Sequence, residues 1–452
     1  MRMKFPKLTT LTTHQWLAIL LVSGFLFTFG YALHFKIVPQ VDARTYDSIA
    51  TNIASGAGYL VDASKSPATD AAIGSVGPIY ELFLAFFFWV FGHNLPVVWF
   101  VQSLLHIATA FIIFLIARRL FSEDGDKIGL ISSGIYIFCI DLIQMPAMIM
   151  SETLHLFLLS LTTYAFVRFY ESPSYRNTVF FGIVCSLAAM TRPTALLVIA
   201  AVVLCAMLRH QYKQAALIIV CTVVLFAPWA IRNYYTYNEF IFTTAAGGYD
   251  IWLGNNLGAN GGAHPTPEIN SYLETHGHIK TSAKGIAEAK SFAIHHPFQV
   301  IKLLIWKTTA YWSIARPYAF WFYLSDIPQK IVLVLSVLWS LILFVLGLAG
   351  AWILWQSKRP ILRWIVAIAV LMPIAVIPII VQTRYRLPVY PYLSLFAGYF
   401  VMHWYRLWKG NLYDKKIYKV VIISSAVIII IAILDILQNL PLILSRLSSL
   451  FT

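Results

Sequence analysis

Long apolar segments recur along almost the whole of this chain, and their length decides what the chain can fold into. Segments such as residues 16–37 and 330–355 exceed the roughly 18 apolar residues that indicate a membrane-spanning helix. Only 12% of the residues are charged, against about 25% in a soluble domain. Because lipid offers no partner to backbone N–H and C=O groups, such segments fold as helices. The sequence therefore predicts an all-α polytopic membrane protein.

The excess of basic residues fits a membrane location better than a nucleic-acid partner. The net charge is +14, but Lys and Arg collect in the cytoplasmic loops of membrane proteins. With about 11 transmembrane helices, every strong basic cluster falls on the cytoplasmic side. These clusters are the N-terminus, Arg118–Arg119, Arg168 with Arg176, Arg209 with Lys213, Lys358–Arg359 and 406–419. We therefore expect membrane lipids as partners and no nucleic acid.

The same count of helices divides the chain into three regions. Residues 1–232 form an N-terminal transmembrane module that includes an external loop, 38–95. Residues 233–329 form a small external loop subdomain with interfacial helices, and residues 330–452 form the C-terminal transmembrane helices. The aromatic run 78–91 is too short to span a bilayer, so we predict an interfacial helix there. An amphipathic helix at 280–295 and a surface segment at 298–321 are also predicted.

Two acidic and three basic residues at helix ends fall together on the external side. They are Asp42, Glu152, Arg192, Arg232 and Arg384. A carboxylate can accept a proton from a hydroxyl nucleophile. Arginine binds phosphate through a planar, permanently charged fork, and it would stabilise a lipid phosphate as that group leaves a sugar. The topology therefore predicts one external site suited to sugar transfer from a lipid phosphate.

Each of these residues also has a purely structural interpretation. Asp42 at a helix end could be a cap, Glu152 suits the first turn of a helix, and external arginines often bind lipid headgroups. Arg192 could merely stabilise the helix break before Pro193. Nucleotide binding is not expected, because the glycine-rich runs lack the lysine of a phosphate loop. Further possible site residues are Asp47, Tyr59, Lys65, Tyr249 and Asn255.

A set of short motifs occurs in a characteristic order: Asp42 with Tyr46, Ala50, Asn52, Gly56, Gly58 and Tyr59; Gly77–Tyr80; Glu152; Arg192–Pro193; Pro228–Asn233; Gly247–Tyr249 with Gly254–Asn256; and Arg384–Pro391. With these motifs the chain resembles the membrane-embedded glycosyltransferases of the GT-C type. Within that group it is similar to the bacterial branch of protein O-mannosyltransferases and the lipid A aminoarabinose transferase. The resemblance implies a GT-C bundle that covers about residues 16–406.

By this resemblance Asp42 would be the catalytic base and Glu152 the second acidic residue, while Arg232, Arg384 and Arg192 would bind the donor phosphate. The donor would be a polyprenyl-phosphate sugar, and the acceptor a hydroxyl of a lipid, a polysaccharide or a protein. The expected location is the bacterial inner membrane, with the N-terminus cytoplasmic and the site periplasmic. Many members carry a second acid directly after the first, where this chain has Ala43.

Other assignments fit parts of the pattern. Asp47 could replace the missing acid, although it lies on another face of the helix. No cofactor is identified with certainty and no metal ligands are assigned, so a divalent metal stays an open alternative. A lipid-linked sugar transporter or flippase would place charged residues near mid-membrane, often within an inverted repeat. An O-antigen-type ligase or polymerase would also act on a lipid-linked donor.

Overall fold

Helices make up all the regular structure that the computed structural model describes, in residues 11–440 without 76, 264, 315–322 and 411–414. The predicted all-α fold is confirmed. The basic N-terminus, residues 2–7, lies outside the described residues. So do residues 315–321, the end of the predicted surface segment.

The first half of the chain forms the layer of the bundle that contains the N-terminal helix. Its elements are α1 (Thr13–Phe35), α2 (Asp42–Ala54), η1 (Ala71–Gly74), α3 (Pro78–Phe91), α4 (Leu95–Leu120), α5 (Gly125–Ile137), α6 (Ile140–Ile143), η2 (Met145–Ala147), α7 (Glu152–Glu171), α8 (Tyr175–Thr191), η3 (Pro193–Ala195), α9 (Leu196–Leu208) and α10 (Tyr212–Tyr237). A capping box opens α1, since the side chains of Thr12 and Gln15 each accept a hydrogen bond from the other residue's backbone N–H. The predicted helix at 78–91 has the bounds of α3.

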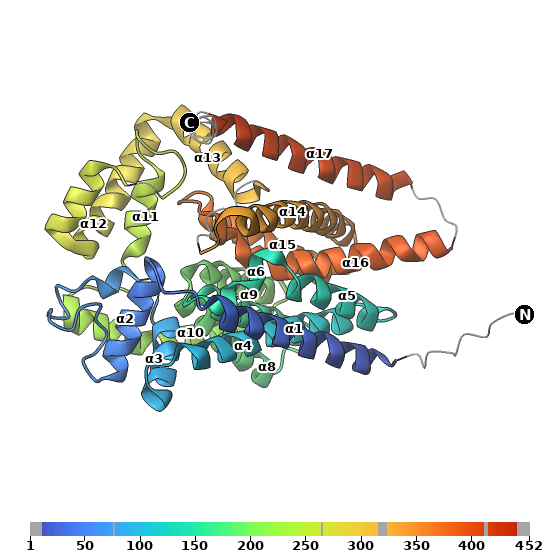
Figure 1. The fold of residues 1–452 in the computed structure, drawn as a ribbon, viewed down its shortest axis with the longest axis horizontal. Coiled ribbons are helices and arrows are strands. Elements are labelled where there is room, and N and C mark those ends of the chain that lie inside the picture. Colours follow the sequence, from blue (N-terminus) through green and yellow to red (C-terminus); the bar gives the residue numbers. More distant parts are fainter. Residues whose placement is uncertain (1–10, 76, 264, 315–322, 411–414, 441–452) are drawn as a thin grey trace, which may run out of the picture.

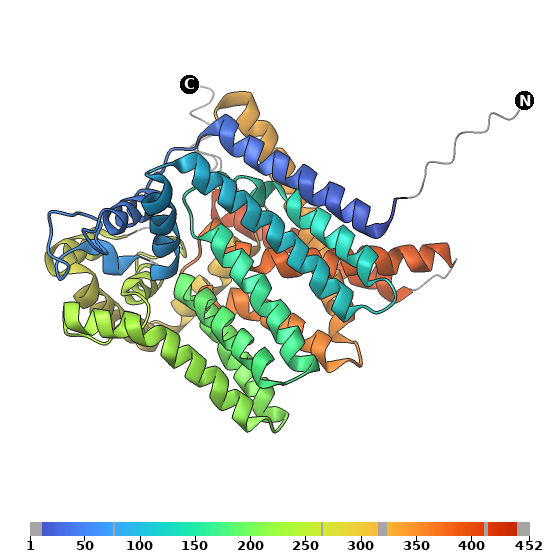
Figure 2. The ribbon, with the colours of Figure 1, turned by 90° about the horizontal axis from the view of Figure 1, so that it is seen from below.

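The second half adds the remaining helices. Its elements are α11 (Ala246–Gly254), α12 (Pro267–His295), α13 (Pro297–Trp312), α14 (Asp326–Trp355), α15 (Pro360–Val376), η5 (Thr383–Val389), α16 (Tyr390–Lys409) and α17 (Lys415–Gln438). Helix α5 packs against α4 and α16, and α16 packs against α14, so that these four helices form one continuous group in the bundle (Figures 1 and 2). One large apolar core runs through this bundle, and a smaller one lies where α14, α16 and α17 meet.

Fewer helices have the length and apolarity of a membrane span than the sequence predicts. Among the described residues five pass, namely α1, α4, α10, α14 and α17, and the bent combination of α5 with α6 and η2 would make six. The prediction of about 11 also counts α7, α8, α9, α15 and α16. These helices have at most 20 residues, and some bury polar groups. Helix α7, for example, buries Glu152, Thr153 and His155.

The segment 128–148, which is one of the roughly 11 spans counted from the sequence, is broken in the structure. Helices α5 and α6 with η2 meet at an angle of 63°. Asp141, in the break, is buried and accepts hydrogen bonds from the Tyr390 hydroxyl at 2.6 Å and from the Arg386 guanidinium at 2.9 Å. A broken helix is tolerated at membrane depth where surrounding protein satisfies its polar groups. The break thus places a buried acid against η5.

Helices α11, α12 and α13 gather at one end of the molecule with α2 and the loop that follows it (Figure 1). The backbone N–H of Ala245 and the hydroxyl of Thr244 both donate to the carbonyl of Ile73, which joins this group to η1. Helix α12 bends at Gly277, where φ is +74°, a conformation that glycine adopts at little cost. The second half of α12 contains the predicted amphipathic helix 280–295.

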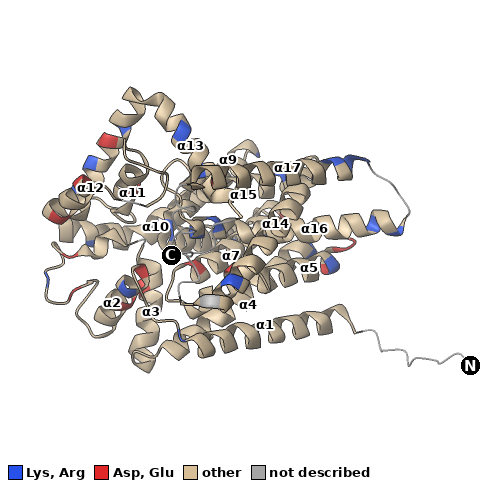
Figure 3. Cartoon of the chain, turned by 45° about the horizontal axis from the view of Figure 1, so that its top comes forward, with Lys and Arg blue, Asp and Glu red and all other residues tan. Residues whose placement is uncertain are grey.

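The basic clusters within the described residues lie at the opposite end of the bundle (Figure 3). Arg119 at the end of α4 pairs with Glu171 at the end of α7, with 2.7 Å between Nη1 and Oε2. Arg406 at the end of α16 pairs with Glu123 at 3.3 Å, and Arg359 donates to the carbonyl of Leu120. Helix α7 has 20 residues and is therefore about 30 Å long. Glu152, at its start, is that far from these clusters.

Candidate active site

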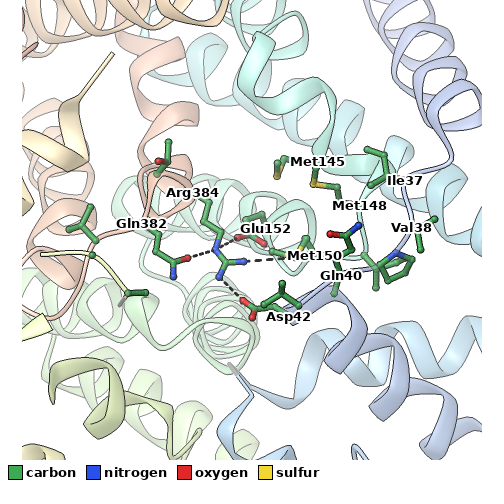
Figure 4. Close-up of a pocket in the computed structure, with 18 of the residues that line it drawn as sticks. Ile37, Val38, Gln40, Asp42, Met145, Met148, Met150, Glu152, Gln382 and Arg384 are labelled. Atoms are coloured by element: carbon green, nitrogen blue, oxygen red, sulfur yellow. Dashed lines mark hydrogen bonds and ion pairs between the residues drawn. The ribbon is translucent and has the colours of Figure 1, made fainter. Parts of the chain in front are cut away.

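Four side chains from distant parts of the chain meet in one charged cluster. The Nη2 atom of Arg384 lies 2.5 Å from Oδ2 of Asp42, and its Nε atom lies 3.9 Å from Oε1 of Glu152 (Figure 4). The Nη2 atom of Arg192 donates to the same Oε1 at 2.6 Å. We call Asp42, Glu152, Arg192 and Arg384 the charged cluster. The structure thus brings together four of the five residues expected at the external site.

The cluster forms because each member stands at the end of a helical element. Asp42 and Glu152 are the first residues of α2 and α7. Arg192 occupies the extended position between α8 and η3, with φ at −146°. Arg384 lies in η5, which follows α15. The four charged residues therefore lie at helix ends on one side of the bundle, and the middle parts of the helices remain apolar.

The two carboxylates of the cluster differ in exposure. The side chain of Glu152 is 2% exposed and that of Asp42 is 37% exposed. Arg192 also donates from Nε to the hydroxyl of Ser151 at 3.1 Å, which fixes its guanidinium beside Glu152. The second oxygen of Glu152, Oε2, is buried and has no hydrogen-bond partner among the described residues. Such an atom is costly unless a ligand satisfies it.

Arg384 is held from several directions. Its Nε donates to Oε1 of Gln382 at 3.0 Å, and its guanidinium carbon lies 5.7 Å from the ring centre of Tyr385. Burial by itself would lower the pKa of Arg384, but the carboxylates of Glu152 and Asp42 raise that pKa above its ordinary value. The guanidinium therefore stays charged at any physiological pH.

A cavity of about 580 Å³ opens beside the cluster (Figure 4). Asp42, Glu152 and Arg384 line its polar part. Gln40, Gln382 and Thr383 add further polar groups, and the rest of the wall is apolar and consists of residues 37–39, Val41, Ala43, Met145, Met148–Met150, Gly262–Ala263, Ala310 and Val381. The cavity therefore offers both charged groups and an apolar surface to one ligand, as an amphiphile requires.

A third acid, Asp250 in α11, faces the same cluster and was not expected from the sequence. Burial, and next the negative charge of Asp42, raise the pKa of Asp250 to about 7, while Arg384 and Arg192 act in the opposite direction. No hydrogen bond or ion pair of its carboxylate is described. The only signal in the sequence was its place directly after Tyr249 in the glycine-rich motif.

Arg232 lies apart from the charged cluster, contrary to its predicted place beside the other arginines. It donates to the carbonyl of Tyr59 at 3.4 Å and to the side chain of Asn233 at 3.1 Å. Its guanidinium carbon also lies 5.2 Å from the ring centre of Trp229. No contact between Arg232 and the cluster is described. Burial and the neighbouring Glu81 raise the pKa of the Tyr59 hydroxyl, so Tyr59 belongs to this second polar group.

The other candidate residues have individual environments. Asp47 lies 2.7 Å from Nε2 of His93. Lys65 is exposed. Tyr249 packs against a small apolar cluster formed around Trp252. None of these three is described in contact with the charged cluster.

Asn255 holds backbone groups rather than pointing into the cavity. Its Nδ2 donates to the carbonyls of Ile251, Pro378 and Ile379 at 2.8 to 3.2 Å. Its Oδ1 accepts a hydrogen bond from Lys307. As to metals, the described part of the chain contains no group of three or more His, Cys, Asp or Glu side chains that could hold an ion.

Comparison with known proteins gives a match to a family model over part of the chain and a likeness of fold over most of it. Residues 75–231 match the family model described as dolichyl-phosphate-mannose-protein mannosyltransferase. This segment includes Glu152 and Arg192 but neither Asp42 nor Arg384. No curated protein sequence matches the chain.

Two solved structures are similar over nearly the full chain. ArnT from Cupriavidus metallidurans, bound to undecaprenyl phosphate, has a TM-score of 0.53 at 12% identity, and the match covers 95% of this chain and 72% of that one. The oligosaccharyltransferase AglB from Archaeoglobus fulgidus, in complex with an inhibitory peptide and a dolichol-phosphate, has a TM-score of 0.50 at 13% identity, covering 95% and 56%. The chain is therefore a membrane protein with the GT-C fold that resembles ArnT and the protein mannosyltransferases.

Proposed function

We propose that this protein is a membrane glycosyltransferase that moves a sugar from a polyprenyl-phosphate donor to an acceptor hydroxyl at the external face of the bacterial inner membrane. The observation that supports the proposal most is the meeting of Asp42 and Glu152 with Arg192 and Arg384 beside a largely apolar cavity. The lipid phosphates named for ArnT and AglB agree with such a donor.

Arg384 is the group proposed to bind the donor phosphate. It lines the cavity and its side chain is 19% exposed, so a phosphate can reach it. Arg192 is less accessible, because its side chain is 10% exposed and bonded to Glu152 and Ser151. Its proposed role is to hold the side chain of Glu152 in place. Arg232 is not part of this proposal, since it contacts Tyr59 instead.

Asp42 is the proposed base. While it is paired with Arg384 at 2.5 Å, its Oδ2 atom is occupied by the guanidinium and is not free to contact an acceptor hydroxyl. A donor phosphate that binds Arg384 competes for the same N–H groups and frees the carboxylate. The base thereby becomes active only when the donor is present.

The proposed reaction is a single displacement at the anomeric carbon of the donor sugar. The acceptor oxygen forms a bond to that carbon as the bond to the phosphate oxygen breaks, which inverts the configuration. The acceptor proton passes to Asp42, and the polyprenyl phosphate leaves with an additional negative charge, which Arg384 stabilises. The free oxygen of Glu152 accepts a hydrogen bond from a substrate hydroxyl and so orients it.

A strain that lacks the gene tests this function without assuming a sugar. Mass spectrometry of its lipids, envelope polysaccharides and proteins is expected to show loss of one sugar modification. The wild-type gene and an Asp62→Asn variant should restore it, because Asp62 is an exposed residue bonded to Ser64, whereas Asp42→Asn should not. A complete and unchanged set of envelope sugars in the deletion strain would contradict the proposal.

A further inference from the structure

Lys307 is a buried cation that has no acidic partner among the residues that the structure describes. Its residue is 0% exposed, and its Nζ donates to the carbonyl of Ile379 at 2.9 Å, the carbonyl of Pro378 at 3.2 Å and Oδ1 of Asn255 at 2.9 Å. All three acceptors are neutral. A buried lysine normally has an ionic partner or shifts its pKa. The position therefore needs an explanation other than charge pairing.

Lys307 and Asn255 together form a clamp on one short segment, residues 378–379. Asn255 donates to the same two carbonyls as Lys307, at 3.1 and 3.2 Å, so residues 378–379 are bound from two sides. The C-terminal end of α11 lies very close to this segment, because a Cβ atom on Gly254 would be only 1.9 Å from the carbonyl oxygen of Ile379. The backbone N–H of Val381 adds a bond to the carbonyl of Gly261 at 3.2 Å.

This segment leads directly to Arg384, which also has an anchor on its other side. Arg386 is fully buried, pairs with Asp141 at 2.9 Å and donates to the carbonyl of Ser313. The chain is therefore held by a buried cation on each side of Arg384. Lys307 binds residues 378–379, which precede Arg384, and Arg386 follows it. Within the described part of the chain, Arg386 has a carboxylate partner and Lys307 has none.

We propose that Lys307, with Asn255, is a positioning residue that fixes Arg384 for the donor phosphate, and that it does so only in its protonated form. The inference rests on the proposed function, because it assigns the clamp to the same donor site. A protonated amine donates three hydrogen bonds to the three oxygens, whereas a neutral amine donates two. Loss of the proton therefore releases one contact and weakens the others.

The clamp would open at moderately alkaline pH. Burial lowers the pKa of Lys307 to about 8. Asp435 of α17 and Arg386 of η5 bond to Ser313, directly after α13, and His295 ends α12 just before α13, whereas burial is the cause of the shift in the pKa of Lys307. Donor affinity should fall as pH rises through about 8. Folding stability should do the reverse, because the unfolded chain binds the proton more tightly between about pH 8 and 10.

The test is binding of undecaprenyl phosphate to the full-length protein in lipid nanodiscs at pH 6.5 to 9.5. For the wild type we expect the dissociation constant to rise on the order of tenfold across pH 8. Lys307→Gln, which keeps two donors but has no titrating group, should bind about tenfold more weakly at pH 7 and lack the alkaline rise. Asn255→Ala should weaken binding and keep the pH dependence.

Matched controls and separate outcomes make the result decisive. Lys302→Met on the exposed side of α13, and Asn256→Ala, whose side-chain amide donates to Trp252 and Leu253, should bind like the wild type. If the wild type does not bind the lipid phosphate, the proposed donor class is wrong. If it binds and Lys307→Gln has the same affinity and pH profile as the wild type, the clamp inference alone is wrong. If the yield of Lys307→Gln is low, hydrogen exchange of the backbone amides around Arg384 gives a second readout, and faster exchange than in the wild type is expected.

Discussion

Breaking the ion pair between Arg192 and Glu152 should destabilise the protein more than any exposed substitution. Their side chains are 10% and 2% exposed, and 2.6 Å separates Nη2 from Oε1. Arg192→Met would leave a buried carboxylate whose nearest cation is Arg384, at 3.9 Å. Removing one partner of a buried pair costs about 3 to 5 kcal/mol. Because Arg384 remains nearby, we expect a loss of about 3 kcal/mol, or roughly 100-fold in the unfolding equilibrium.

A double variant separates the cost of an unpaired buried charge from the cost of the changed side-chain shape. Arg192→Met with Glu152→Gln has no buried charge to strand, so it should recover most of the lost stability while transfer activity stays low. The measurement is reversible unfolding by sodium dodecyl sulfate in mixed micelles, with Arg118→Met as the control, since Arg118 is half-exposed and pairs with Asp126 at the other end of the bundle. A loss below about 1 kcal/mol for Arg192→Met, as for an exposed pair, would refute the reasoning.

Three further predictions concern single positions near the cluster. Gly254→Ala should lower the melting temperature strongly, because its Cβ would lie 1.9 Å from the Ile379 carbonyl, whereas Gly247→Ala in the same helix meets nothing within 4 Å and should not; equal melting temperatures would contradict the close approach. Arg384→Gln should raise KM for the donor and lower kcat, and an unchanged KM in steady-state kinetics would remove it from the phosphate site. The pKa of Asp250 is raised to about 7, so the folded state binds more protons than the unfolded state between about pH 4 and 7. Asp250 should therefore reduce stability as pH rises through that window, and Asp250→Asn should be more stable than the wild type at pH 8, with a difference that disappears near pH 4; a difference independent of pH in unfolding titrations would contradict this.

Hydropathy and helix-end chemistry predict much of this structure. The length of the apolar segments alone identifies the helical membrane fold. Because the basic clusters all fall on one side of the membrane, the count of helices places Asp42, Glu152, Arg192 and Arg384 together at the other end of the bundle. These patterns do not show in which direction a side chain at a helix end points. Arg232 follows an exiting helix as Arg384 does, yet its side chain lies among Tyr59 and aromatic rings, because the rotation of a helix depends on its packing.

Partners that are distant in the sequence account for the remaining differences. The helix break at Asp141 is invisible in an apolar run, since its partners Arg386 and Tyr390 lie about 250 residues later in the chain. Lys307 interrupts an aromatic segment and could be interpreted as a surface residue, whereas the end of α11 and residues 378–379 bury it. Asp250 is an ordinary loop acid until α11 packs beside η5.

The most direct test of the proposed function is sugar transfer by purified protein in nanodiscs, with polyprenyl-phosphate sugar donors and the acceptor found by mass spectrometry. We predict that Asp42→Asn lowers kcat by at least about 100-fold, the usual contribution of a positioned base, while Asp62→Asn keeps wild-type kcat and both proteins bind undecaprenyl phosphate. Full transfer activity in Asp42→Asn would contradict the assignment of Asp42 as the base and, with it, the proposed mechanism.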